Sequence, residues 1–496
     1  MAEIVDRHLP TRGRAQLTNA EVVSALIANR LAAPSPLYDI AGWASSAAVH
    51  ELFGIPAMLL NDDRLGRALD AFAPRAEQIR GAIALAAIDR FGVDAGRLHL
   101  DLTSLRVAGA YEESSLVAKG WDHQRQTVRQ IKVLQATNPL GVPLYSRPQA
   151  GNQAELTAIA DGLQRLTELM PPGLVVCADS SFGHVRYLCA ADRAQVGFVV
   201  PLREISNYRQ LYAEQIGRQA LQPLDYLPWR ERELPPERRT QYRGCLRRLP
   251  VIDPATGANH LFKVAFIWSS QEEATVREAR ERALDKAEQE LLRVQRGLGS
   301  YYRSRQKVQN RVAVILSGKA QSLIHAEVGG ADPKPTLEFH RDPQAIAEQA
   351  ASDGIYALTS NLPEVSASDL LRIYKEQSLV ELRHRDLKQT LRVRPIFLHN
   401  DDRIQALVSI VGLALTIFGL IELELRQAVG HDAELAGLLP EGRSARPTGR
   451  NVLAAFQGLG LTYTPAGMRL DRLTATQRRI LATLGIAIPW PENAAA

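Results

Sequence analysis

The sequence of 496 residues lacks the hallmarks of several protein classes. Its three cysteines, Cys177, Cys189 and Cys245, form no C-x-x-C pair, so the spacing supports neither a disulfide framework nor a cysteine-ligated zinc site. There is no H-E-x-x-H motif and no G-x-x-x-x-G-K-[ST] motif. Zinc proteases and P-loop ATPases are therefore disfavoured, and we expect no nucleotide cofactor.

Long apolar runs are also scarce. The longest, residues 406–421, is too short to span a bilayer and contains Ser409 and Thr416. The N-terminal segment MAEIVDRHLPTRGR lacks the apolar centre of a signal peptide. We therefore expect a buried core helix at 406–421, no membrane span and a cytoplasmic protein.

The bulk composition is that of a globular protein. The chain is 46% apolar and 23% charged, and its length suits roughly three domains of about 150 residues each. The formal net charge of +5 is compatible with a polyanionic partner, but it is too small to identify one. The placement of the charges along the chain therefore matters more than their sum.

Residues 1–94 are predicted to form a helical N-terminal domain. From Thr18 to Asp89 apolar residues recur at three-to-four spacing, and Thr18 or Asn19 is a suitable helix cap. DNA binding at a specific sequence and plain packing are equally compatible with this pattern.

After Gly96 the apolar period changes to two. The runs at 97–107, 127–137 and 141–150 predict an antiparallel meander, and a helix follows at 153–170. GLVVCADSS is a continuous apolar run typical of a buried central strand, and GFVVPLRE predicts a fifth strand. This order predicts an α/β, ribonuclease H-like core with a mixed five-stranded sheet, formed by residues 95–205 and 354–430.

Residues 206–353 are predicted to be an insertion domain within that core. They contain a strand at FKVAFIW, a long helix at 270–298 and a second apolar strand at VAVILS. Residues 291–326 carry seven Lys or Arg and no acid, including Arg303, Arg305 and Lys307 next to Tyr301 and Tyr302. A solvated helix face is one interpretation and contact with phosphates is the other, which the tyrosines favour. Residues 431–496 are predicted to form a C-terminal helical region.

One helix is predicted from Ser366 onwards, because Ser366 and Asp369 have capping-box spacing. Tyr374, Glu381 and Lys388 are seven residues apart and fall in one row, with Gln377 and Arg385 beside it. A salt-bridged surface is the simpler interpretation of such a row. Two strand-borne carboxylates make a catalytic interpretation stronger, since Asp101 lies in an alternating strand and Asp179 ends an apolar one. Asp179 could instead cap a helix.

These motifs together resemble the DDE transposases of bacterial insertion sequences, in the insertion-sequence-four superfamily with its Tyr-x2-Arg-x3-Glu-x6-Lys signature. Tyr374, Glu381 and Lys388 match the signature, whereas Gln377 stands where it has Arg. HLDLTSLRVAG, GWDHQRQTVRQIKV, GVPLYSRPQAGN, VVCADSSFG and DGIYALTSNL also match, so the resemblance covers residues 95–425.

The resemblance implies a two-metal transposase. Asp101 would bridge two Mg²⁺ ions, for which Mn²⁺ would substitute, and Asp179 and Glu381 would each hold one. Tyr374, Arg385 and Lys388 would contact phosphates. The implied partners are double-stranded element ends and target DNA, bound by a homodimer at the bacterial nucleoid.

The resemblance also implies an aromatic residue in the insertion that stacks on a flipped base. The candidates are Trp229 and Trp268, although Trp268 lies in an apolar strand and fits a core position better. His123 and Arg125 could line the cleft, and an exposed turn is the simpler interpretation. Two other functions stay open: a ribonuclease H-like nuclease without strand transfer, and an inactive DNA-binding derivative.

Overall fold

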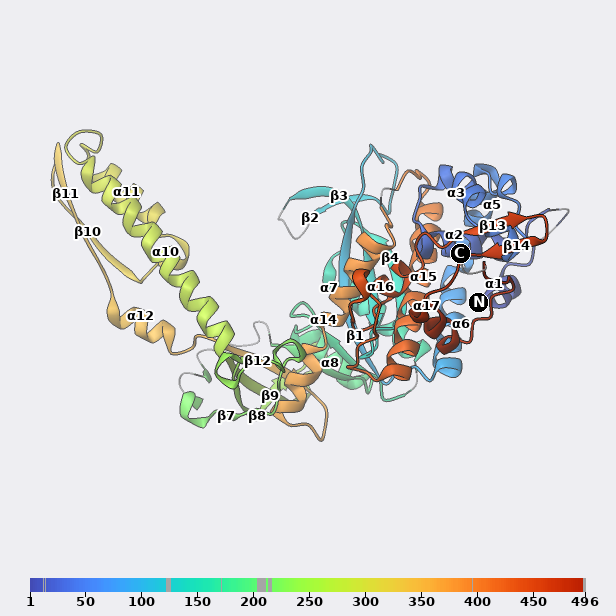
Figure 1. Cartoon of the computed structure of the whole chain (residues 1–496). Coiled ribbons are helices and arrows are strands. Elements are labelled where there is room, and N and C mark those ends of the chain that lie inside the picture. Colours follow the sequence, from blue (N-terminus) through green and yellow to red (C-terminus); the bar gives the residue numbers. More distant parts are fainter. Residues whose placement is uncertain are drawn as a thin grey trace. The chain divides into compact units, whose positions relative to one another are not determined.

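The computed structural model describes residues 1–496 except 12, 14, 122–125, 171, 203–210, 213–215, 395 and 494–496. Two compact units make up the chain, coloured along the sequence in Figure 1. The first comprises Met1–Phe182, Gln195–Gly197 and Glu376–Ala496, and the second comprises Gly183–Ala194 and Phe198–Lys375.

The N-terminal region is helical, as predicted. Its helices are α1 (Ala2–His8), α2 (Asn19–Ala32), α3 (Ile40–Ser46), α4 (Val49–Phe53), α5 (Asp62–Phe72) and α6 (Ala76–Phe91). Thr18 caps α2 in a reciprocal capping box with Glu21, which satisfies backbone N–H groups that the first turn leaves unpaired.

Helix α15 (Asp401–Val429) is the core helix of the first unit. It packs against α2, α5, α6 and β4, and one hydrophobic cluster joins the N-terminal helices to it. By length and composition α15 could cross a membrane, but 83% of its most apolar window is buried inside the protein. The prediction of a buried core helix is confirmed, and the helix extends beyond the predicted run at both ends.

The sheet of the first unit is mixed. Its strands are β1 (Arg97–Arg106), β2 (Ala118–Trp121), β3 (Thr127–Thr137), β4 (Pro143–Ala150) and β5 (Val175–Ala178), and α7 (Glu155–Leu169) links β4 to β5. β1, β2 and β4 each pair with β3 in antiparallel fashion, while β1 and β5 are parallel. The predicted meander is confirmed, and β2 is an additional short strand.

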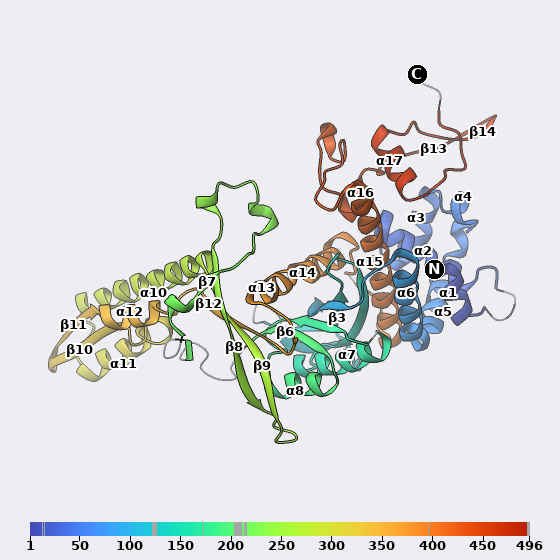
Figure 2. The same ribbon diagram turned by 90° about the horizontal axis from the view of Figure 1, so that it is seen from below.

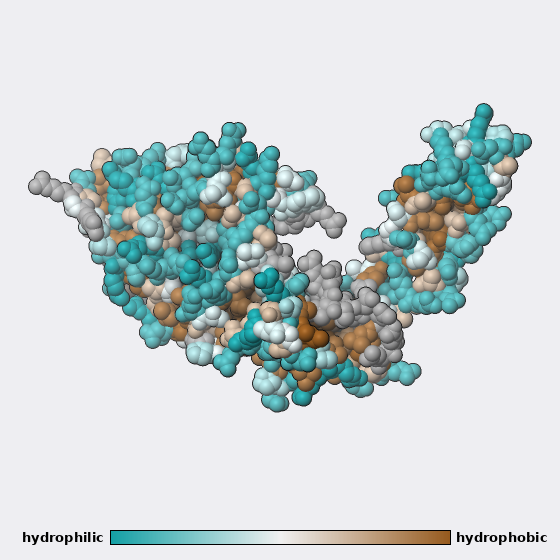
Figure 3. Space-filling view, turned by 180° about the vertical axis from the view of Figure 1, so that it is seen from behind, coloured by the Kyte–Doolittle hydropathy of each residue, from teal (hydrophilic) through white to brown (hydrophobic). Residues whose placement is uncertain are grey.

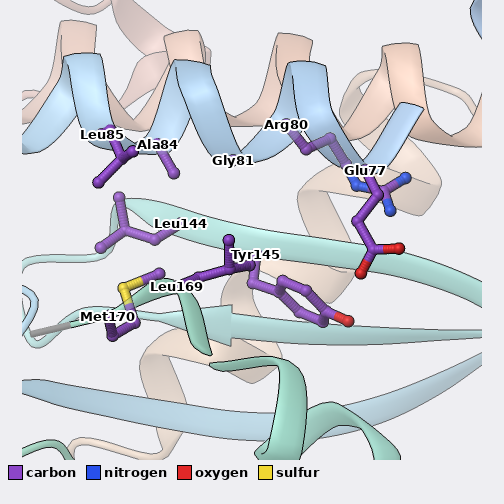
Figure 4. A pocket seen from close by; sticks show the side chains of 9 residues that line it. All are labelled: Glu77, Arg80, Gly81, Ala84, Leu85, Leu144, Tyr145, Leu169 and Met170. Atoms are coloured by element: carbon purple, nitrogen blue, oxygen red, sulfur yellow. The ribbon is translucent and has the colours of Figure 1, made fainter. Parts of the chain in front are cut away.

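Helix α6 covers part of this sheet. Figure 4 shows a small pocket between α6 and β4, lined by apolar side chains such as Leu85 and Leu144 and by the polar groups of Arg80 and Tyr145. Arg80 donates a hydrogen bond of 2.6 Å to Ser409 of α15, so a buried cation ties two helices together. Burial raises the pKa of Tyr145, which keeps its hydroxyl neutral.

The second unit has an antiparallel sheet. Its strands are β6 (Gly197–Pro201), β7 (Gln222–Pro223), β8 (Tyr242–Ile252), β9 (Asn259–Ser269) and β12 (Ile355–Ser360), and its helices include α8 (Val185–Arg193) and α13 (Ala367–Lys375). The strand order is β6-β12-β9-β8-β7. Phe266, Tyr212 and Ile355 belong to the core on this sheet, and the strand predicted at FKVAFIW lies within β9.

A subdomain with its own core follows β9. It contains α10 (Ser270–Arg296), α11 (Arg305–Ile315), β10 (Ile324–Ala331), β11 (Lys334–Arg341) and α12 (Pro343–Ala350), which pack together in Figure 2. On the face shown in Figure 3, hydrophobic side chains gather in the middle of this subdomain and hydrophilic ones surround them. The strand predicted at VAVILS is wrong, because Val312–Ile315 end α11. A short apolar run does not distinguish strand from helix, and the preceding RQKVQNR favours helix.

The C-terminal region of the first unit is mixed rather than helical throughout. It contains α16 (Gly449–Ala454), β13 (Leu461–Thr464), β14 (Gly467–Leu470) and α17 (Ala475–Thr483). Leu438, Val452 and Ile480 pack with Leu425 at the end of α15, so this region extends the core of that helix.

A buried ion-pair network joins α14 (Ser378–Arg385) to α15. Arg383 is 1% exposed and lies 3.1 Å from both Glu422 of α15 and Asp386. Its Nε donates a 2.6 Å hydrogen bond to the carbonyl of Gly141, and Arg426 pairs with Glu422 from the other side. Each buried charge here has an opposite charge beside it, which is the condition for burying charge without a large penalty.

We predict that Arg383→Ala lowers the free energy of unfolding by roughly 3–5 kcal/mol, because it leaves the buried Glu422 and Asp386 short of a counter-ion. Urea unfolding followed by circular dichroism measures this. Arg403→Ala is the matched control, since Arg403 pairs with Asp70 at the surface and its loss should cost about 1 kcal/mol or less. Equal small effects of the two substitutions would contradict the account.

Candidate active site

Asp101 and Asp179 lie on neighbouring parallel strands. In the β1–β5 pairing, Leu100 lies opposite Ala178. The residues that follow them, Asp101 and Asp179, are therefore at the same level of the sheet. Both aspartates are partly exposed, whereas Leu100 and Ala178 are buried. The register therefore brings the first two predicted carboxylates together at one edge of the first unit.

The two oxygens of Asp101 have different neighbours. One oxygen accepts a 2.8 Å hydrogen bond from the backbone N–H of Leu102, and the other lies 3.3 Å from Nδ1 of His384 on α14. The His384 side chain is buried, and its Nε2 has no hydrogen-bond partner within the described residues. His384 thus connects the strand that carries Asp101 to the helix that carries Glu381.

Asp179 makes local contacts. It accepts a 2.9 Å hydrogen bond from the backbone N–H of Ser181 and another from the Ser181 hydroxyl. Asp179 is not the N-cap of the next helix, because α8 begins at Val185 with His184 as its cap. Its carboxylate therefore stabilises a turn and stays at the end of β5.

Glu381 is an exposed residue of α14, a helix that packs on β1 and β3. It precedes His384 by three residues, which places the two side chains on the same side of α14. The third predicted carboxylate therefore lies one helical turn from a side chain that contacts Asp101. Glu381 itself is exposed, so its carboxylate is accessible to an ion from solvent.

The predicted single helix through Tyr374, Glu381 and Lys388 is wrong. The chain forms α13, then a turn at Glu376 and Gln377, then α14 and a π-helical turn, η9 (Asp386–Thr390). At the turn, backbone hydrogen bonds span three residues, as in a 3-10 helix. The N–H of Leu379 donates to the carbonyl of Glu376, and the N–H of Val380 donates to the carbonyl of Gln377. The three residues do not form one row on a continuous helix, although the predicted capping box of Ser366 and Asp369 is present.

The turn at 376–377 is anchored on β1. Gln377 is buried, and its Nε2 donates a 3.2 Å hydrogen bond to the carbonyl of Leu100, beside Asp101. Its Oε1 lies 3.4 Å from Nδ1 of His99, while Glu376 pairs with Arg97 at 2.8 Å. From the sequence we did not predict that Gln377 anchors this turn. The one indication was the Gln in place of the signature Arg, since a neutral amide can be buried against a backbone carbonyl more easily than a charged group.

The three carboxylates do not form a ready-made ligand cluster. A different group of metal-ligating side chains is clustered within the described residues. It consists of Cys189, Asp253 and His260, whose ligand atoms all lie within 4.8 Å of one another. Asp101 and Asp179 instead turn to their local donors. Their oxygen donor chemistry and partial exposure fit a hard divalent cation, which would have to draw the three side chains inward.

Lys388 lies close enough to Asp101 for their charges to interact. The pKa of Lys388 is lowered to about 8, mainly by burial and to a smaller extent by the charge of the nearby Arg394, while the charge of Asp101 acts in the opposite direction. Arg385 is exposed on α14. Tyr374 belongs to the second unit, where its ring lies 6.4 Å from that of Tyr356.

The two tryptophans and the basic residues before and in α11 lie in the second unit. Trp229 is 50% exposed in a short 3-10 turn, whereas Trp268 is largely buried in β9, as its apolar strand predicted. Arg303, Arg305 and Lys307 are exposed at and before the start of α11, with the Lys307 ammonium 4.1 Å from the ring centre of Tyr301. His123 and Arg125 lie outside the described residues.

Paired carboxylates on a mixed sheet with a third on an adjacent helix are the ligand type that metal-dependent phosphoryl-transfer enzymes use. Residues 94–417 match the transposase DDE domain family, and residues 1–80 match a domain of unknown function (DUF4277). The first match covers more than half of the chain, so this protein belongs to the family of DDE transposases. It is accordingly a transposase that acts on DNA, in a family that uses divalent metals. No curated protein matches the chain.

We predict that the Lys388 amine of the metal-free protein titrates near pH 8, so that it is mostly charged below that pH and mostly neutral at pH 9. Asp101→Asn should lower this pKa further, because the carboxylate charge favours the ammonium form. Competitive amine labelling at graded pH, read by mass spectrometry with N-acetyl-lysine as the internal control, measures both values. Titration of Lys388 together with the control compound would contradict the prediction.

Proposed function

We propose that this chain is the transposase of a bacterial insertion sequence, which cleaves DNA at the element ends and transfers the freed 3′ ends to target DNA. The observation that carries the proposal is the β1–β5 register, which sets Asp101 beside Asp179 in a chain of the DDE family. His384 supports the third position, because it links Asp101 to the helix of Glu381.

The proposed catalytic core is ribonuclease H-like. Support comes from the antiparallel β1, β3 and β4, followed by α7 and by a β5 that pairs parallel to β1. The segment 206–353 would be the insertion, since α10 to α12 and β10–β11 have a separate core. The N-terminal helices would contribute to recognition of the end sequence.

Asp101, Asp179 and Glu381 would hold Mg²⁺, with Mn²⁺ as a substitute, because carboxylate oxygens are the ligands that these hard ions prefer. When bound, two such ions activate the attacking oxygen of a phosphodiester displacement and neutralise charge on the leaving oxygen. His384 would orient Asp101 through its contact with Oδ2, and the anchored turn at Gln377 would set the position of α14 on β1.

The cations of α14 and η9 would position the DNA backbone. Arg385 is exposed for direct phosphate contact, and Lys388 would regain its full charge beside a phosphate because an anion raises the pKa of an amine. Tyr374 would contribute a hydroxyl to a phosphate near the scissile bond. Trp229 is the better candidate for stacking on a flipped base, because it is half exposed and Trp268 is not.

The proposed partners are double-stranded element ends and target DNA. Two ends must be held together for transposition, so the mechanism requires a homodimer in the DNA complex. The basic start of α11 would bind backbone phosphates, since Arg303, Arg305 and Lys307 are all exposed. The protein would work in the bacterial cytoplasm, at the nucleoid when it is bound to DNA.

A nuclease without strand transfer is the alternative, since hydrolysis needs the same carboxylates. The two functions separate when the protein is incubated with Mg²⁺, labelled element-end DNA and a target plasmid. Transposase activity yields labelled end DNA covalently joined to the plasmid. Cleavage with no joined product, under conditions that permit joining, would support the nuclease.

We predict that Asp101→Ala, Asp179→Ala and Glu381→Ala each lower end cleavage by roughly 10³-fold or more while binding of end DNA stays near the wild-type level. Cleavage rates and gel-shift binding measure the two effects. Asp161→Ala, which removes an exposed carboxylate of α7, is the control and should leave both unchanged. Normal cleavage by any of the three variants would remove that residue from the site.

We predict that the triple variant Arg303→Ala, Arg305→Ala, Lys307→Ala binds end DNA more weakly and with a shallower salt dependence, by up to about 0.9 in log–log slope for each lost phosphate contact. Gel-shift titrations over a range of KCl concentrations measure the slope. The matched control removes three exposed cations of α10 that lie among acids: Arg277, Arg282 and Lys286. An equal change in both triple variants would show that only total charge matters.

A further inference from the structure

A second cluster of metal-ligating side chains lies in the second unit, outside the carboxylate site. Cys189 comes from α8, Asp253 follows β8 and His260 lies in β9, and one ligand atom of each is within 4.8 Å of the others. Cys189 and Asp253 are no more than 1% exposed. The cluster thus joins α8 to the β8–β9 hairpin, whose turn lies beside α8 in Figure 2.

The His260 ring is oriented as a ligand would be. Its Nδ1 lies 2.6 Å from a carboxylate oxygen of Asp192, and the other oxygen of Asp192 accepts a 2.8 Å hydrogen bond from Asn361. This arrangement places the ring proton on Nδ1 and leaves the lone pair of Nε2 directed away from Asp192. Nε2 is buried and has no hydrogen-bond partner within the described residues. A carboxylate behind a histidine is the usual support of a metal-ligating imidazole.

Both oxygens of Asp253 have partners in the metal-free protein. One oxygen accepts from the backbone N–H of Ala255, and the other accepts from Thr256 and lies 3.8 Å from Nε2 of His260. Arg193 pairs with the same carboxylate and is the cation that a metal would displace. Its side chain is 41% exposed, so it can move into solvent. Burial raises the pKa of the Cys189 thiol, which therefore keeps its proton until a cation replaces it.

We propose that Cys189, Asp253 and His260 bind one zinc-type divalent cation that fastens the β8–β9 hairpin to α8. Thiolate and imidazole ligands favour a borderline-soft ion such as Zn²⁺ over Mg²⁺, and a water would complete a tetrahedral shell. Binding releases the thiol proton to solvent as the metal–sulfur bond forms. The site would hold two elements together, and it is separate in ligand chemistry from the three carboxylates, which offer only oxygen.

Cobalt titration of the metal-free full chain tests the proposal, because Co²⁺ bound to a thiolate gives a near-ultraviolet charge-transfer band. About one Co²⁺ per chain should produce this band, and Zn²⁺ should displace it. Cys189→Ser should abolish the band, whereas Cys245→Ser, which alters another buried cysteine, should retain it. Asp101→Ala should also retain it, so failure of this site and failure of the carboxylate site are distinguishable.

Two further measurements keep the test decisive if Cys189→Ser does not fold. Asp192→Asn should weaken zinc binding by about 10–100-fold, because it removes the carboxylate support of His260. X-ray absorption of the zinc-loaded wild-type chain should show one sulfur ligand. A shell of nitrogen and oxygen alone, a band unchanged in Cys189→Ser, or unaltered zinc affinity in Asp192→Asn would overturn the proposal.

Discussion

The ion-pair network around Arg383 is the constraint on which the candidate active site depends. Arg383 is nearly inaccessible to water, yet it pairs with Glu422 and Asp386 and donates to the carbonyl of Gly141. The backbone at Gly141 has a positive φ of 85°, and a Cβ there would come within 2.9 Å of the guanidinium. Because this network fixes the rotation of α14 about its axis, it also fixes where His384 and Glu381 face. A small shift of α14 would separate His384 from Asp101.

Much of the sheet of the first unit was predictable from the sequence, because burial on one face gives alternating apolar residues and burial on both faces gives a continuous apolar run. The alternation in β1 and β3 and the continuous apolar run of β5 predicted these strands, and the parallel β1–β5 pairing brings Asp101 and Asp179 to one level. The choice of Glu381 as a site residue rests on the signature spacing alone. Its structural setting could not be predicted in that way, since it depends on α14 packing against β1.

Other features depend on contacts that are distant in sequence, and these the sequence did not reveal. The break at 376–377 follows from hydrogen bonds of Gln377 to β1, about 280 residues earlier in the chain, and helix propensity contains no trace of them. The same holds for the cluster of Cys189, Asp253 and His260, whose chain spacing matches no metal motif. The end of the helix at 305–315 was predicted to be a strand, because a run of four apolar residues fits the period of a strand as well as that of a helix.

The electrostatics of the two proposed metal sites differ in a way that suits different ions. Asp101 and Asp179 of the first are partly exposed, Glu381 is exposed, and burial lowers the pKa of Lys388 beside Asp101 to about 8. The second is buried, and its histidine is held by a carboxylate and an amide. Hard oxygen ligands at an open edge favour exchangeable Mg²⁺, whereas buried sulfur and nitrogen favour a retained zinc-type ion.

Anomalous diffraction from crystals of the protein bound to end DNA and Mn²⁺ would locate the ions of the proposed active site without reference to activity. Mn²⁺ should be bound to carboxylate oxygens of Asp101, Asp179 and Glu381, with α14 still held by Arg383. Well-occupied Mn²⁺ at the DNA phosphates that contacts other side chains, with these three carboxylates turned away, would show that the metal site lies elsewhere.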